Sequence, residues 1–180
     1  MKMVFRLFLP AALIALGIWL WFVLFPSPEK IIRKQLAGLA HAVSFSSNES
    51  DMAKLAGAQG LAGFFSTNAQ VNIDVPGYEQ HAFAGRDEIT QAALASRAAV
   101  SSLTVKFPDV NVTVAPDKQS AIADVTVEAN VAGEKDAIVQ EMKFTFQKMG
   151  GQWLISRVET VRTLSILNFE RPRFVFILTE

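Results

Sequence analysis

Residues 136–162, with the sequence DAIVQEMKFTFQKMGGQWLISRVETVR, decide the fold. Apolar and polar side chains alternate on both sides of Gly150-Gly151, and two glycines between alternating runs are typical of a tight hairpin turn. The stretch therefore predicts two antiparallel strands that share one apolar face. The register of a two-residue turn opposes Phe146 to Ile155, Phe144 to Arg157 and Met142 to Glu159.

Two further strands precede this hairpin and extend it into a four-stranded meander. Turn residues at Pro116–Gln119 and Gly133-Glu134 separate the strands. Both turns keep the apolar side chains of neighbouring strands on one face, whereas a one-residue slip would move them to the other. Pro108-Asp109 shifts the alternation, which indicates a β-bulge. The expected strands are Leu103–Ala115, Ser120–Ala132, Asp136–Lys148 and Trp153–Arg162.

Helices and a short hairpin precede the meander. Ser27 and Pro28 predict a helix start, because serine caps helices and proline fits their first position. Apolar residues then recur at helical spacing up to Val43. The further elements expected here are a helix over Asp51–Phe65, a hairpin that turns at Pro76-Gly77 and a helix from Asp87 to about Ala99. The sequence thus predicts an α+β domain with an antiparallel sheet that helices cover on one side.

This succession of elements resembles the nuclear transport factor 2-like superfamily of SnoaL-like and cystatin-like domains. Two local motifs carry the resemblance, Gly85–Ile89 (GRDEI) and Gly150–Ile155 (GGQWLI), and it extends over residues 29–164. The resemblance implies a curved sheet wrapped around the N-terminal helices as a cone, with a ligand cavity between them. Members include isomerases, dehydratases, epoxide hydrolases, polyketide cyclases, transport factors and secretion-system assembly proteins, so it implies a fold and not one function.

Three polar residues, Gln140, Arg157 and Glu159, are expected on the apolar face of the meander. Arg157 and Glu159 are two positions apart on one strand, so they project to the same side. One interpretation is that they bind a polar group of a small hydrophobic ligand. The other is an ion pair near the end of the strand whose members satisfy only each other.

The sequence offers no catalytic set and no metal site. The resemblance implies a carboxylate and a tyrosine for steroid isomerisation, but the only tyrosine, Tyr78, is expected in a turn and Asp124 on the polar face. His41 and His81 have no partners at metal-ligand spacing. We expect no cofactor. Formal net charge is zero with Lys and Arg scattered along the chain, so we expect no nucleic-acid partner. Cysteine is absent, so no disulfide helps the fold.

Leu7–Phe25 contains no charged residue, and a helix over this run would be about 28 Å long, enough to cross a bilayer core. We therefore expect residues 1–28 to form a short cytoplasmic tail, a signal anchor and a linker. A cleaved signal peptide is the alternative, but Pro26–Lys30 offers no small-x-small cleavage site. The positive-inside rule favours a cytoplasmic N-terminus. The domain would then lie on the periplasmic or extracytoplasmic side of the inner membrane.

Residues 165–180 form an apolar tail that contains Phe174–Leu178, a run too short to span a membrane. Phe174, Phe176 and Ile177 are its candidates for an interaction. The run either covers its own domain, adds to the sheet of a partner, or enters the bilayer interface.

Two functions fit these observations. The preferred hypothesis is a membrane-tethered interaction or assembly module that forms homo- or hetero-oligomers, without enzymatic activity. The alternative is a tethered binding protein or enzyme for a small hydrophobic ligand in the cone cavity. An open, ligand-sized pocket would favour the alternative, whereas a cavity filled by Trp153, Phe144 and Met142 would count against it.

Overall fold

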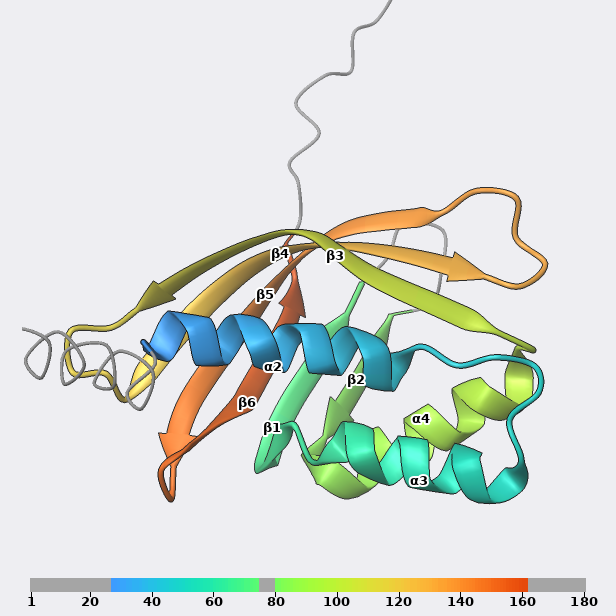
Figure 1. Cartoon of the computed structure of the whole chain (residues 1–180), viewed down its shortest axis with the longest axis horizontal. Coiled ribbons are helices and arrows are strands. Elements are labelled where there is room, and N and C mark those ends of the chain that lie inside the picture. The colour runs from blue at the N-terminus through green and yellow to red at the C-terminus, as the bar shows by residue number, and fades with distance from the viewer. Residues whose placement is uncertain (1–26, 75–79, 162–180) are drawn as a thin grey trace, which may run out of the picture.

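A curved six-stranded sheet arches over three helices in the computed structural model, which describes residues 27–74 and 80–161 (Figure 1). The predicted anchor Leu7–Phe25 and the tail 165–180 lie outside the described residues. Within the described ranges, no helix has the length and hydropathy needed to cross a membrane. The helices are α2 (Pro28–Val43), α3 (Asp51–Ala62) and α4 (Gly85–Ala99), and the strands are β1 (Phe65–Ile73), β2 (His81–Ala84), β3 (Leu103–Val114), β4 (Ser120–Val131), β5 (Ile138–Met149) and β6 (Gln152–Thr160).

The sheet has the strand order β2-β1-β6-β5-β4-β3, and it is mixed. Strand β1 runs parallel to β6, while every other neighbouring pair is antiparallel. The prediction of a purely antiparallel sheet is therefore wrong at this one pairing. Strands joined by a short turn are necessarily antiparallel, but β1 and β6 are far apart in the sequence, so no turn residue indicates their relative direction.

Helix α2 lies across the concave side of the sheet, and α3 and α4 pack together beside it (Figure 1). The apolar stripe of α2 is buried against the inward side chains of the strands, and it consists of Ile32, Leu36 and Leu39. Each such side chain contributes about 1.5–3 kcal/mol when it is fully removed from water. The amide of Gln35 also donates a hydrogen bond to the carbonyl of Trp153 at 2.7 Å. The predicted helical stripe is thus what holds α2 on the sheet.

The meander follows the predicted turns closely. Ala123 pairs with Phe144 and also with Val112, as the turn lengths require. The register shifts between Lys106 and Asp109, which confirms the bulge predicted there.

The helix boundaries differ slightly from the predicted ones. Helix α3 ends at Ala62 because the chain enters β1 at Phe65.

Helix α4 begins two residues before the predicted start at Asp87. Gly85 has a φ of 83°, a value that glycine adopts without steric cost. The carboxylate of Glu88 accepts a hydrogen bond from the backbone N–H of Ala84 at 2.7 Å. This contact satisfies a donor at the entry to the helix, where N–H groups lack intrahelical partners. The turn at Gly85 therefore sets the helix start, and not a side-chain cap by Asp87.

One strand pairing corrects the predicted register. Phe146 opposes Ile155 as expected, but Thr145 then opposes Arg157, which leaves Ser156 as an extra residue on β6. The hydroxyl of Ser156 donates to the carbonyl of Thr145 at 3.2 Å, an arrangement that fits a β-bulge. Beyond this bulge the two faces of β6 are exchanged. Val158, and not Arg157, opposes Phe144.

This register predicts different effects at two adjacent positions. Val158 is 3% exposed, so Val158→Ala should lower the free energy of unfolding by about 2 kcal/mol through lost burial and a cavity. Arg157 lies on the exposed side, so Arg157→Ala should change it by less than about 1 kcal/mol. Thermal unfolding of the full-length protein measures both. A larger loss for Arg157→Ala than for Val158→Ala would contradict the bulge.

Candidate functional site

An apolar cavity of about 390 Å³ lies between the concave face of the sheet and the helices. Every described helix and strand contributes to its wall. Leu39 and Phe65 are buried side chains of the wall, and so are Met142 and Phe144 on β5. The cavity exists because the sheet curves away from α2 while α3 and α4 pack beside that helix. Its volume falls in the range of about 300–1,000 Å³ that is typical of small-molecule pockets.

The wall carries almost no polar chemistry. Among the residues of the wall that the structure describes, His81 and Ser96 are the only polar side chains, and none is Asp, Glu, Lys or Arg. Both polar residues are exposed. The hydroxyl of Ser96 donates to the carbonyl of Ala93 at 2.9 Å, and the ring of His81 stacks on Phe83 with centroids 6.1 Å apart. General acid–base catalysis needs a titratable pair within reach of the substrate, and the described part of this wall offers one imidazole without a carboxylate.

The sequence-predicted residues lie outside this wall. Arg157 and Glu159 form an ion pair of 4.0 Å, with 52% and 40% of their side chains exposed. Arg157 also donates to the side-chain oxygen of Gln70 at 3.0 Å. The bulge at Ser156 turns Arg157 and Glu159 away from Phe144, which corrects their predicted place on the apolar face. An exposed pair of this kind contributes at most about 1 kcal/mol.

Gln140 lies on β5 two positions before Met142, opposite Val127. Its side-chain amide donates to the backbone carbonyl of Val161 at 3.3 Å. Val127 belongs to the cavity wall, but Gln140 does not. The contact instead holds the end of β6 against β5.

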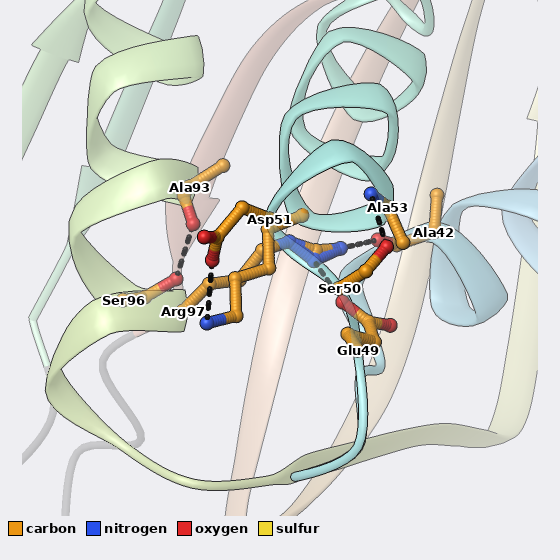
Figure 2. Close-up of polar contacts among 9 residues, drawn as sticks. Ala42, Glu49, Ser50, Asp51, Ala53, Ala93, Ser96 and Arg97 are labelled. Carbon is orange, nitrogen blue, oxygen red and sulfur yellow. Dashed lines mark hydrogen bonds and ion pairs between the residues drawn. The ribbon is translucent and has the colours of Figure 1, made fainter.

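Arg97 on α4 is a buried charge that the sequence analysis missed. It is 6% exposed, and its guanidinium donates to the carbonyl of Ala42 at 2.7 Å (Figure 2). A carboxylate oxygen of Glu49 lies 3.9 Å from Nη1, and the ring of Phe45 lies 4.9 Å below Cζ. The side chain therefore ties α4 to the end of α2 and to the connection that follows.

A sequence signal for this buried arginine does exist. Ile89, Ala93 and Arg97 are spaced by four and form the buried stripe of α4, so the periodicity alone places a charge on the inward face. A second signal is Gly57 on α3. A Cβ at that position would lie 2.9 Å from Nη2 of Arg97, so only glycine leaves room for the guanidinium as it is placed.

The described residues, 27–74 and 80–161, contain no group of three His, Cys, Asp or Glu side chains that could hold a metal ion.

Comparison with solved structures places this architecture among known folds. The UBP3-associated protein Bre5 of yeast superposes with a TM-score of 0.57 at 15% identity, over 76% of this chain and 98% of that one. An NTF2-like protein of unknown function from Pseudomonas putida KT2440 gives 0.55 at 14% identity, over 72% and 82%. The chain has the nuclear transport factor 2-like fold. A candidate aromatic ring hydroxylase from Novosphingobium aromaticivorans also resembles this nuclear transport factor 2-like domain, with a TM-score of 0.57 at 16% identity over 72% and 85% of the two chains.

Neither a scan against protein-family models nor a search of curated proteins finds a match for the chain. The similar structures include a candidate enzyme and a protein named for its association with another. At these identities the likeness shows the fold alone, so the function has to be argued from the cavity and its surroundings.

Proposed function

We propose that this nuclear transport factor 2-like domain binds a small apolar ligand in its cone cavity, without acid–base chemistry. The observation that carries the proposal is the open cavity of about 390 Å³ with an almost wholly apolar wall. Phe144 and Met142 form part of that wall instead of filling the space, and Trp153 is buried outside it. The cavity therefore favours the ligand-binding hypothesis over the assembly hypothesis that the sequence preferred.

The membrane tether is part of the same proposal. Leu7–Phe25 would anchor the chain in the inner membrane, with the N-terminus inside and the domain on the periplasmic or extracytoplasmic side. Helix α2 starts at Pro28, so the domain would lie close to the bilayer surface. An apolar molecule is concentrated in that bilayer, which makes it an accessible ligand for a tethered apolar pocket.

The expected affinity is modest. Burying about 300 Å² of apolar ligand surface contributes about 7 kcal/mol, and the loss of translational and rotational freedom opposes it by several kcal/mol. No charged group among the described residues of the wall adds an oriented contact. We therefore expect dissociation constants no tighter than about micromolar, with selectivity by size and shape.

Native mass spectrometry of the full-length protein, extracted from its own membrane with detergent, tests the proposal. We expect a bound species of a few hundred daltons that is lost in Ala92→Phe, because Ala92 lies in the cavity wall and a phenyl ring would fill the space. Ala95→Phe is the matched control, since Ala95 is exposed on the same helix. Equal retention in both variants, or no bound species in the wild type, would contradict ligand binding in the cavity. Release of the protein without detergent would contradict the tether.

Protein assembly is the second candidate function. It is favoured by the outer face of the sheet, where Ile122 on β4 and Val139 on β5 are exposed and none of the described helices covers the strands (Figure 1). The yeast neighbour Bre5, which is UBP3-associated by name, is a protein of the same fold that acts with a partner. The native mass spectra test this as well, because co-migrating subunits or a defined oligomer would support it and a monomer without subunits would not.

A further inference from the structure

The mouth of the cavity is itself apolar and partly open to water. Phe83, Val105, Phe107 and Val127 line the cavity and are only half-buried. These side chains come from β2, β3 and β4, so the mouth extends across much of the width of the sheet. Leaving such a surface uncovered is unfavourable, since burial of apolar area contributes about 25 cal/mol per Å². An apolar occupant would therefore stabilise the domain.

The described chain ends beside this mouth. Val158 is a wall residue of β6, and Val161 follows three positions later. The carbonyl of Val161 accepts a hydrogen bond from Gln140, and Gln140 pairs with Val127 at the rim. Residues 162–180 follow Val161 in the sequence. They therefore continue from a position close to the opening, because Gln140 alone lies between Val161 and the rim residue Val127.

The sequence beyond Val161 contains a segment with matching chemistry. Phe174–Leu178 reads FVFIL, five consecutive apolar residues. Residues 162–173 connect it to Val161, and this connection can extend to about 40 Å. That reach exceeds the radius of gyration of about 14 Å expected for a domain of this size. Length therefore does not prevent the segment from reaching the mouth.

We propose that Phe174–Leu178 of the same chain occupies the mouth of the cavity. Two phenylalanine side chains in that position would each remove about 150–250 Å² from water. The preceding Glu170-Arg171-Pro172-Arg173 is polar and would stay in solvent at the rim. The tail and an apolar ligand would then compete for the same wall, a consequence that rests on the proposed function.

Engineered cysteines test the occupancy directly, because the chain has no native cysteine. In the full-length protein in its membrane, Val105→Cys is combined with Ile177→Cys and oxidised. Val105 lies in the wall, whereas the next residue, Lys106, is exposed. Lys106→Cys with Ile177→Cys is therefore the matched control. We expect an intramolecular disulfide in severalfold higher yield for the Val105 pair, because the two Cα atoms of a disulfide lie within about 7 Å of each other.

Other results would overturn the proposal. Equal yields for the two pairs would mean that the segment does not prefer the mouth, for example because it lies in the bilayer interface. Disulfide-linked dimers would mean that a second copy supplies the segment. Both double-cysteine variants are checked by thermal unfolding before oxidation, so a variant that fails to fold is recognised. If the Val105→Cys variant does not fold, Phe107→Cys replaces it.

Native mass spectra separate this proposal from the proposed function. Phe174→Ser with Phe176→Ser should raise the fraction of protein that carries a bound species, since the competitor is removed. If the disulfide forms but neither this variant nor the wild type carries a bound species, tail occupancy stands and ligand binding fails. If a bound species is present and depends on Ala92, but the disulfide shows no preference, ligand binding stands and tail occupancy fails.

Discussion

Replacing Arg97 by alanine should lower the free energy of unfolding by about 3 kcal/mol. The substitution removes a charged hydrogen bond to the carbonyl of Ala42, worth about 1.5–3 kcal/mol, and a cation–π contact with Phe45, worth up to about 2 kcal/mol where it is desolvated. The apolar stem of Arg97 is also buried. Thermal and urea unfolding of the full-length protein measure the loss.

The ion pair with Glu49 is a weaker contact of Arg97 than the hydrogen bond to Ala42. The two charged atoms are 3.9 Å apart, and neither Nη1 of Arg97 nor Oε2 of Glu49 has a hydrogen-bond partner within the described part of the chain. Glu49→Gln should therefore cost less than Arg97→Ala, but more than the about 1 kcal/mol that is typical of exposed pairs, because the buried charge of Arg97 loses its counter-ion. If Glu49→Gln lowers the free energy of unfolding as much as Arg97→Ala does, the ion pair with Glu49 contributes most of the stabilisation by Arg97, and the hydrogen bond to Ala42 contributes little.

Gly57 supplies a sharper control, because its missing side chain makes room for the guanidinium. Alanine in a helix is favoured over glycine by about 1 kcal/mol, but in the wild type its Cβ would displace Arg97 from Ala42. In the Arg97→Ala background the guanidinium that the new Cβ would meet is absent. Gly57→Ala should therefore raise the free energy of unfolding in that background. A double-mutant cycle should give a coupling energy of about 1–2 kcal/mol. If the changes in free energy of unfolding for Gly57→Ala and Arg97→Ala are additive, a side chain at position 57 does not displace Arg97.

The strands of the meander could be predicted because their turns are visible in the sequence. Gly133-Glu134 and Gly150-Gly151 fix both the ends and the register of the adjacent strands. The bulge near Pro108 was also predictable, since proline cannot donate to a ladder. The bulge at Ser156 has no such marker. Serine fits a regular strand, and its hydroxyl bond to Thr145 appears only in three dimensions.

This single unmarked bulge explains why the candidate site was misplaced. It exchanges the faces of β6 beyond Ser156, so Arg157 and Glu159 move to the outer side and Val158 enters the cavity wall. The cavity itself was expected only from the resemblance of the fold. Its wall draws on every described element, and no local sequence pattern encodes a space formed by contacts between residues so distant in the chain.

The position with the largest expected loss on truncation is Phe146. Its side chain is 0% exposed, and it is the largest of the fully buried side chains in the described part of the chain. It lies opposite Ala121 on β4 and Ile155 on β6, and the small side chain of Ala121 leaves space for the ring. Phe146→Ala should therefore lower the free energy of unfolding by about 3–5 kcal/mol, because a fixed sheet and helix cannot collapse into the void.

Ile122 provides the matched control for this truncation. It neighbours Ala121 on β4 but is 43% exposed on the outer face, so Ile122→Ala should change the free energy of unfolding by about 0.5 kcal/mol or less. Phe146→Leu should cost less than Phe146→Ala, since most of the apolar volume remains. Urea unfolding of the three variants separates these cases. Similar losses at Phe146 and Ile122 would mean that the two faces of β4 and β5 are equally solvated, and the register derived from the turns would then be wrong.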